Sequence, residues 1–229
     1  MALRAVADGV WVVDLEFKLA GVQIGLRTTV LGTGDGGVVV IAPAKLEQTD
    51  LEAIRALGPV RAVIAPNAFH HLYLGRAAEA FEGARVLAAA GVAAKQPKLR
   101  IDATLGTPEA AALGVFGTAI EALSLVGSPK SAETVFFHRP SRTLTVTDSV
   151  FNIEKSDHLW TRTFLKMNGA YGAPSASRIF RSSIADRAAF RASVDRMLAL
   201  DPERLHMAHG ALIEKNGRDV LARTYEWLR

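Results

Sequence analysis

The segment 61–75, RAVIAPNAFHHLYLG, constrains the fold of this chain more than any other stretch of its sequence. Its opening apolar, β-branched run is typical of a buried strand. Pro66 has no N–H to give to a sheet ladder and therefore ends that strand. Two adjacent histidines, His70 and His71, follow a short loop, and a helical pattern covers residues 75–82. A strand, a loop and a helix in this order predict an α/β protein with polar chemistry at the strand end.

Composition narrows the possible functions. The chain has 229 residues, enough for one large domain or two small ones, and its hydrophobic content of 49% is ordinary for a globular protein. Its net charge of +4 is spread without a basic run, so we expect no nucleic-acid partner. Because the chain has no cysteine, disulfides and thiolate sites are excluded, and a transition metal can be held only by His, Asp or Glu.

The N-terminal sequence predicts no export signal. Acidic residues at positions 8, 14 and 16 interrupt it, so it lacks the continuous apolar core of a signal peptide. No apolar stretch approaches the ~20 residues that a membrane span requires. We therefore expect a cytoplasmic protein without a membrane partner.

Periodicity predicts alternating strands and helices in two successive halves. Strands are expected over 10–17, 22–31, 38–41, 60–64, 84–87, 120–125, 133–138, 143–147 and 204–208. Helices are expected over 49–57, 75–82, 91–99, 186–200 and 220–228, with Thr49 as the N-cap of the first. Residues 1–115 and 116–229 each contain antiparallel-looking strands followed by βα units, with no linker between them. We therefore predict one domain, 1–229, built as two sheets with helices outside.

Candidate metal ligands follow three of these strands. His70 and His71 come after the first, Asp148 directly follows the strand LTVT, and His209 follows the last strand. Ligands presented from strand ends are held by a rigid scaffold, as a metal site requires. Imidazole and carboxylate together suit zinc, iron or manganese.

A metal-free arrangement of the same residues is the alternative. His70 and His209 can pair with Asp148, while Asn67 bonds the loop backbone. Side chains of consecutive residues in extended backbone diverge, so only one of the two adjacent histidines is expected to point inward. Of the two, we favour His71.

These motifs resemble the metallo-β-lactamase superfamily, and more closely an uncharacterised family within it that carries P-N-x-x-H-H-L-Y-L. The similar segments are TTVLGTGDGGVVVIAP, APNAFHHLYLG, LTVTDSVFN, MNGAYGAPSASRIFRS and MAHG, which together span nearly the whole chain. The resemblance implies a four-layer αββα sandwich with the metal site between the ends of its paired sheets.

The chain departs from the superfamily motif H-x-H-x-D-H. Aligning His71 with the last histidine places His70 at the aspartate, and Pro66 and Ala68 at the two histidines of the first metal. Ser128 is the nearest candidate for a further first-metal ligand, and it is a poor one. The resemblance thus implies a degenerate centre with one surviving position.

That surviving position defines the predicted site. Its metal ligands are His70, His71, Asp148 and His209, and the catalytic roles fall to His70 and Asp148. The predicted substrate-binding residues are Asn67, Ser128, Arg178 and Arg181.

Two functions follow from this site. One is a hydrolase with a single divalent metal and a small-molecule substrate. The other is a catalytically inactive descendant that binds a small ligand in the old cleft, where Arg178 and Arg181 would supply charge for an anionic one. A purely structural role has no specific support, and the sequence does not define the oligomeric state. Among the remaining histidines, His138 is expected to be exposed, His206 outward or half-buried, and His158 at the pocket mouth.

Overall fold

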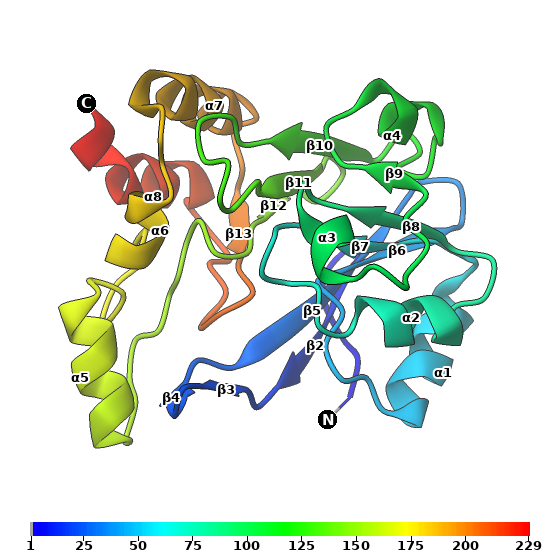
Figure 1. The fold of residues 1–229 in the computed structure, drawn as a ribbon, viewed down its shortest axis with the longest axis horizontal. Helices are drawn as coiled ribbons and strands as arrows, with labels where there is room; N and C mark the ends of the chain where they lie inside the picture. Colours follow the sequence, from blue (N-terminus) through cyan, green and yellow to red (C-terminus); the bar gives the residue numbers. More distant parts are fainter. Residues whose placement is uncertain (1) are drawn as a thin grey trace.

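The structure, a computed structural model, describes residues 2–229 (Figure 1). Its strands are β1 (Arg4–Ala7), β2 (Val10–Leu15), β3 (Lys18–Leu19), β4 (Val22–Gln23), β5 (Leu26–Gly32), β6 (Val38–Ile41), β7 (Val60–Ala65), β8 (Arg85–Ala88), β9 (Ala103–Thr104), β10 (Ile120–Ser124), β11 (Thr134–His138), β12 (Thr143–Thr145) and β13 (Arg204–His206). Its helices are α1 (Gln48–Leu57), α2 (Leu74–Ala80), α3 (Val92–Lys95), α4 (Pro108–Ala112), α5 (Leu159–Met167), α6 (Arg178–Ser182), α7 (Arg187–Ala199), α8 (Gly217–Thr224) and the 3-10 helix η1 (Glu226–Leu228).

The strands of the described residues form two main sheets. A seven-stranded sheet has the order β1-β2-β5-β6-β7-β8-β9, and a four-stranded sheet has the order β10-β11-β12-β13. Strands β6 to β9 are parallel to one another, as are β12 and β13. The short β3–β4 hairpin stands apart from both sheets and packs beside α5 (Figure 1).

The two sheets pack face to face, and helices cover both outer faces. In β7, Ala62 and Ile64 enter the core between the sheets, while Val63 faces α1 and α2. In β11, Phe136 enters the same inter-sheet core, whereas its neighbour Val135 packs toward α7 and α8. This period-2 alternation is possible because successive side chains of a strand point to opposite faces. The predicted four-layer αββα sandwich is confirmed.

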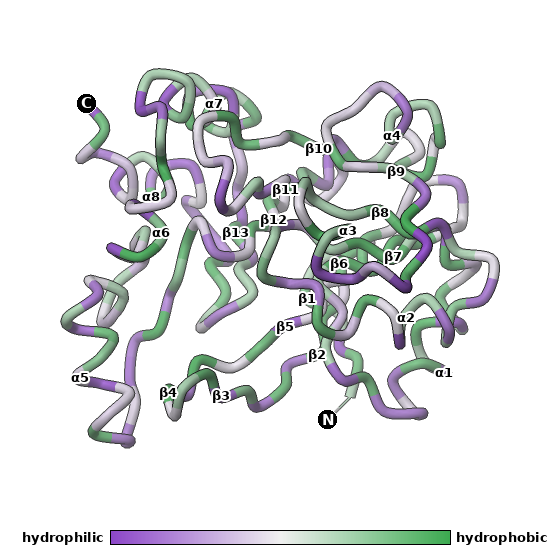
Figure 2. Tube along the Cα trace, in the orientation of Figure 1, coloured by the Kyte–Doolittle hydropathy of each residue, from purple (hydrophilic) through white to green (hydrophobic). Residues whose placement is uncertain are grey.

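The central strands read as continuous apolar runs because both of their faces are buried. Strand β6 has the sequence VVVI and all four of its side chains are buried; its tube and that of β7 are largely coloured as hydrophobic in Figure 2. No helix within residues 2–229 is long and apolar enough to cross a membrane.

Most element predictions hold to within a few residues, with two informative differences. The predicted strand 22–31 is broken into β4 and β5 around Gly25, whose φ is +64°. The first helix starts after Glu47 rather than Thr49, because the Asp50 carboxylate accepts the Glu47 N–H at 3.2 Å and closes the first turn. The division into two halves, 1–115 and 116–229, stays a prediction.

Two histidines expected at or near the surface are buried. His138 packs in β11, where its Nδ1 lies 2.8 Å from Ser141 Oγ, and burial lowers its pKa. His206 in β13 has no exposed surface. Its neighbours Leu205 and Met207 face the helices, so His206 points between the sheets. In a sandwich of this kind neither face of β13 is open to solvent.

Candidate metal centre

Three strands carry polar side chains to one point beyond their carboxyl ends. The chain leaves β7 at Ala65 and reaches His70 in a turn, leaves β12 and reaches Asp148, and leaves β13 and reaches His209. One ligand atom from each of His70, Asp148 and His209 lies within 4.8 Å of the others. These three residues are called the His–Asp–His cluster below.

The carboxylate stands between the two imidazoles. Asp148 Oδ1 lies 3.4 Å from His70 Nε2 and 3.4 Å from His209 Nε2. The two rings are tilted by 48° with centroids 5.2 Å apart, and Phe151 stacks on the other side of His209 at 5.0 Å. The histidine side chains are only 7% and 4% exposed, so the cluster is largely withdrawn from water.

The backbone fixes the tautomer of His209. Its Nδ1 lies 2.8 Å from the carbonyl oxygen of Gly25, which can only accept a hydrogen bond, so Nδ1 carries the proton. In the neutral ring Nε2 is therefore a lone-pair donor, and it faces Asp148. A hydrogen bond from the far ring nitrogen to a carbonyl is how proteins orient a metal-binding histidine.

Asn67 holds both Asp148 and the histidine turn. Its Nδ2 donates to Asp148 Oδ2 at 2.7 Å and to Thr147 Oγ1 at 2.9 Å. Its Oδ1 accepts the backbone N–H groups of Phe69 and His70, each at 2.9 Å. Since one fully buried side chain bonds two segments, the position of His70 relative to Asp148 is set by Asn67.

Glu133 holds the Asp148 loop through hydrogen bonds to its carboxylate. Its buried carboxylate accepts the backbone N–H groups of residues 147, 148 and 149 at 2.8, 3.1 and 3.0 Å, and the Ser149 hydroxyl at 2.7 Å. Burial and the nearby charge of Asp148 raise the pKa of Glu133, while these hydrogen bonds oppose the shift. The loop that presents Asp148 is thus wrapped around a second, structural carboxylate.

Arg27 and Gly210 fix the loop that presents His209. The Arg27 guanidinium donates to the carbonyl of Met207 at 2.6 Å and to that of Gly210 at 2.9 Å, on either side of His209. Its Nε donates to Asp14 at 2.6 Å, which balances the buried charge. Gly210 has φ +96°, and a Cβ there would lie 2.1 Å from the carbonyl oxygen of Asn152. Only glycine fits this close approach.

The acidic and basic groups of the cluster shift each other's pKa. Burial alone would raise the pKa of Asp148, but the adjacent His70 and His209 imidazoles hold it well below its usual range. For His70 burial lowers the pKa, and the Asp148 carboxylate outweighs burial and raises it. Asp148 is therefore an ionised carboxylate, the form that a cation prefers.

His71 lies outside the cluster. The prediction that His71, and not His70, points inward is therefore wrong. Its Nδ1 is 3.1 Å from Nε2 of Gln96, just beyond α3, and the same amide donates to the His71 carbonyl at 3.3 Å. Burial and the nearby charge of Lys95 lower its pKa. The turn held by Asn67 is not extended backbone, so His70, and not His71, faces Asp148.

The predicted substrate-binding residues fall in different places. Asn67 lies beside the cluster, but it is buried and fully engaged with Asp148 and the loop backbone. Ser128 is buried with its Oγ 2.6 Å from Ser183 Oγ, so it acts in packing. Arg181 lies over the Trp227 ring at 4.4 Å and donates to the carbonyl of Ala176. Arg178 is exposed at the start of α6. The arginines are not part of the cluster.

Several contributing residues were missed by the sequence reasoning. Glu133 and Arg27 are lone charged residues beside or within apolar strands, and that isolation is a signal that can identify a buried, bonded charge. Phe151 lies in the segment LTVTDSVFN and carries no comparable signal. The carbonyl of Gly25 has no side-chain signal and could be found only from the structure.

Several solved structures that share this fold are metallo-β-lactamases. A metallo-beta-lactamase from Pontibacter korlensis superposes with a TM-score of 0.63 at 14% identity, covering 99% of this chain and 97% of that one. A metallo beta lactamase from Erythrobacter litoralis gives 0.63 at 16% identity, covering 99% and 91%. One from Hirschia baltica gives 0.63 at 13%, covering 99% and 97%. At these identities the likeness shows a metallo-β-lactamase-like fold.

Sequence comparison identifies a narrower group. No curated protein matches the chain in sequence. The family model described as "Domain of unknown function (DUF4336)" matches residues 7–160, about two thirds of the chain. The protein therefore belongs to the DUF4336 family and has a metallo-β-lactamase-like fold.

Proposed function

We propose that the protein is a metal-dependent hydrolase of a small-molecule substrate, with one divalent ion held by His70, Asp148 and His209. Zinc, iron and manganese are the candidate ions, because imidazole and carboxylate ligands suit all three. The fold, in which related structures are metallo-β-lactamases, and the geometry of the cluster support this proposal.

One observation carries the proposal. His209 donates through Nδ1 to Gly25, so in its neutral form the ring directs an Nε2 lone pair at the Asp148 carboxylate 3.4 Å away. Two electron-rich atoms facing each other in a buried site are unfavourable unless a proton or a cation lies between them. His209 and Asp148 would hold a divalent ion between them and so remove this conflict, and a ligand atom of His70 is also near.

Three protein ligands leave a coordination position for water or substrate, which is the pattern of catalytic zinc sites. When bound, the ion supplies Lewis-acid polarisation of a carbonyl or phosphoryl oxygen and makes water a better nucleophile. The chain's own residues orient that chemistry. Asn67 and Glu133 fix Asp148, while Gly25 and Arg27 fix His209, so the ligands do not need to reorganise.

A single ion fits this chain better than two. Pro66 and Ala68, which stand where the superfamily resemblance places two first-metal histidines, have buried apolar side chains without ligand atoms. Ser128 is occupied by Ser183. A second ion would therefore lack protein ligands at these positions, and two-metal hydrolysis of β-lactams is not expected.

A ligand-binding descendant without activity is the second candidate. The observation in its favour is that His70 and Asp148 already form an acid–base pair, which can neutralise the buried carboxylate without a metal. Arg181, however, stacks on Trp227 and donates to the carbonyl of Ala176, so it is not free to bind an anionic ligand at the cluster.

Metal titration separates the two candidates. The purified protein is first stripped of any bound metal and then titrated calorimetrically with Zn²⁺ or Mn²⁺. It is expected to bind one ion per chain. Asp148→Asn and His209→Ala should weaken binding by more than about 100-fold, since loss of outer partners alone costs about 10–100-fold.

His71→Ala is the matched control, because it removes an adjacent imidazole outside the cluster. It is expected to bind metal like the wild-type protein. Loss of binding in His71→Ala, or no binding by the wild-type protein, would contradict the one-metal proposal. Hydrolysis of p-nitrophenyl carboxylic esters and bis-p-nitrophenyl phosphate, with and without metal, then tests whether the centre is catalytic.

A further inference from the structure

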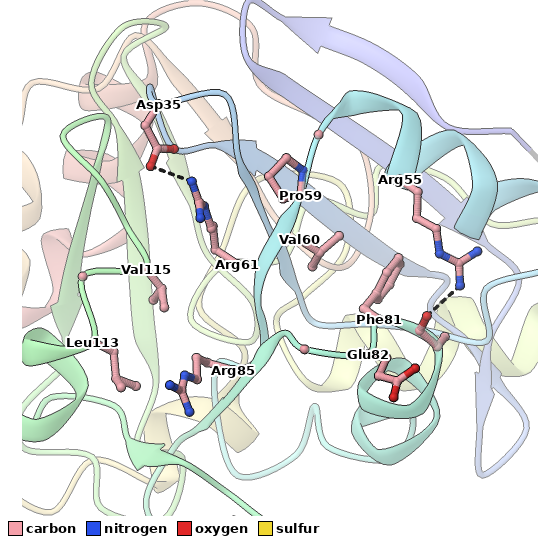
Figure 3. A pocket seen from close by; sticks show the side chains of 14 residues that line it. Asp35, Arg55, Pro59, Val60, Arg61, Phe81, Glu82, Arg85, Leu113 and Val115 are labelled. Carbon is pink, nitrogen blue, oxygen red and sulfur yellow. Dashed lines mark hydrogen bonds and ion pairs between the residues drawn. The ribbon is translucent and has the colours of Figure 1, made fainter.

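A second concave site lies at the opposite end of β7 from the His–Asp–His cluster. Residues at the amino ends of β7 and β8, the end of α2 and the loop 113–115 surround a hollow of about 780 Å³ (Figure 3). This volume is within the range of about 300–1,000 Å³ found for small-molecule sites. We call it the arginine-lined hollow.

Three arginines line the hollow, and they differ in how they are paired. Arg61 donates to Asp35 at 3.1 Å. Arg55 donates to the carbonyl oxygen of Ala80 at 2.6 Å, a neutral partner. Arg85 lies 3.5 Å from Asp102, too far for a strong hydrogen bond, and its side chain is 53% exposed. Arg85 is thus the guanidinium best placed to receive a new anion.

The charge of the lining favours a singly charged ligand. Asp35 and Glu82 line the hollow with the three arginines, and Asp102, which pairs with Arg85, is shared with Arg100, so the arginines exceed the acidic groups by one charge. A carboxylate neutralises that charge, whereas a phosphate dianion would leave a net negative site. A guanidinium also presents its donors as a planar fork that matches a carboxylate.

The remaining wall is apolar. Figure 3 shows Leu113 and Val115 on one side of the hollow and Val60 and Phe81 on the other, with Arg61 and Arg85 between them. Phe81 and Val115 are buried in the cores and hold this wall in place, while the half-buried Val60 and Leu113 present apolar surface to the hollow. A hydrophobic body can be buried against it while a charged end meets Arg85.

We propose that the arginine-lined hollow binds a small carboxylate with an apolar or aromatic body, with Arg85 as the main anion partner. The site does not depend on the metal centre, which lies at the other end of β7. An allosteric effector or a stored metabolite of this chemistry would both fit, and binding alone is what the hollow supports.

Ligand-detected and protein-detected NMR can test the proposal with 2-naphthoate as the probe. In ¹⁵N-labelled wild-type protein, saturable shifts are expected at residues 58–61, 80–85 and 113–115. Arg85→Met should weaken binding by about tenfold or more because it removes the charge-assisted contact. Arg191→Met, an exposed arginine on α7, is the matched control and should stay within about twofold of wild type.

Two further probes test the charge argument. 2-Naphthylmethanol, which is neutral, should bind at least about tenfold more weakly than 2-naphthoate. Tighter binding of 2-naphthyl phosphate than of 2-naphthoate would overturn the monoanion assignment. Absence of saturable shifts, shifts elsewhere, or equal affinity in Arg85→Met would overturn the site itself.

A variant of the metal centre makes the two proposals distinguishable. His209→Ala is expected to bind 2-naphthoate with the wild-type affinity, because it leaves the hollow intact. If the metal proposal fails while the NMR shifts appear at the hollow, this inference stands. A loss of 2-naphthoate binding in a folded His209→Ala protein would show that the probe occupies the cluster and would contradict the inference.

Discussion

The two ends of β7 use polar residues in opposite ways. Beyond its carboxyl end, Asn67 and Glu133 are buried, the His–Asp–His cluster is largely buried, and hydrogen bonds join these residues across three loops. At its amino end, Arg61 and Arg85 are about half exposed and line an open hollow. The same strand therefore carries a preorganised centre at one end and an adaptable surface at the other.

This difference has a physical consequence. A buried polar group that loses its partner pays the full desolvation cost, whereas an exposed charge returns to water. Substitutions at the cluster end should therefore change stability and geometry strongly, and substitutions at the hollow end should change only what the surface binds. The following predictions test that contrast.

The largest effect is expected for Glu133→Ala. It leaves three backbone N–H groups and the Ser149 hydroxyl without their buried acceptor, and should reduce the free energy of unfolding by about 3–5 kcal/mol. Glu133→Gln, which keeps the shape and one acceptor oxygen, should lose less. Urea denaturation measures both losses. A loss below about 1 kcal/mol for Glu133→Ala would contradict the expectation that the cluster end of β7 is more sensitive to substitution than the hollow end.

Two glycines compare the ends directly. Gly210→Ala should cost about 3 kcal/mol or more, because φ is +96° and the new Cβ would meet the Asn152 carbonyl oxygen at 2.1 Å. Gly83→Ala at the hollow has a similar φ of +86° but no atom within 4 Å, and should cost only about 1 kcal/mol. Equal losses in thermal or urea unfolding would show that backbone conformation, and not local packing, sets the cost.

Acid should destabilise the strand that leads into the cluster. Burial and the nearby Arg27 and Arg204 lower the pKa of His206 to about 3, below the 6.5 of an unperturbed histidine. His206 therefore takes up a proton more readily in the unfolded chain than in the folded one. Its contribution to stability is full above pH 6.5 and is lost as the pH falls toward 3. Between pH 7 and pH 5 the loss should be about 2 kcal/mol.

The His206→Asn variant isolates that contribution. Urea denaturation at pH 7 and pH 5 should give a smaller pH-dependent loss for the variant than for the wild-type protein. The same pH dependence in both proteins would assign the acid sensitivity to other groups and refute the prediction.

A moderate effect is expected for Asn67→Ala on metal binding. Removing the amide that holds Asp148 and the turn of His70 should weaken the affinity for Zn²⁺ by about tenfold or more. The measurement is calorimetric titration alongside Gln96→Ala, which removes the equivalent contact of His71 outside the cluster. Equal affinities in the two variants would show that Asn67 does not position a ligand.

The smallest effect is expected for Arg85→Met on stability. Because the side chain is half exposed and only loosely paired, its removal should change the free energy of unfolding by less than about 0.5 kcal/mol. Urea denaturation checks this value. A loss of more than 2 kcal/mol, on the order of a buried ion pair, would make Arg85 part of the structural framework instead of a free surface.

Much of the fold could be predicted from local sequence. The apolar runs of β6 and β7 and the alternation in β11 follow from period-2 geometry, and Pro66 marks the end of β7 as expected. The resemblance to metallo-β-lactamases supplied the αββα arrangement, which periodicity alone specifies only as two sheets with outer helices.

The candidate site was predicted less completely, for physical reasons. Choosing between His70 and His71 requires the turn that the Asn67 side chain creates, and such loop geometry is not contained in strand periodicity. The buried position of His206 depends on the first sheet, far away in sequence. Arg181 was assigned to the cleft by its charge, but stacking on Trp227 directs it elsewhere. Each of these differences is caused by a tertiary contact that local sequence does not specify.

Anomalous diffraction from zinc-soaked crystals tests the central claim most directly. We predict a single zinc peak per chain, about 2.0–2.2 Å from His70 Nε2, His209 Nε2 and a carboxylate oxygen of Asp148. A peak that excludes these atoms, two zinc ions in the site, or no peak at saturating zinc would contradict the account.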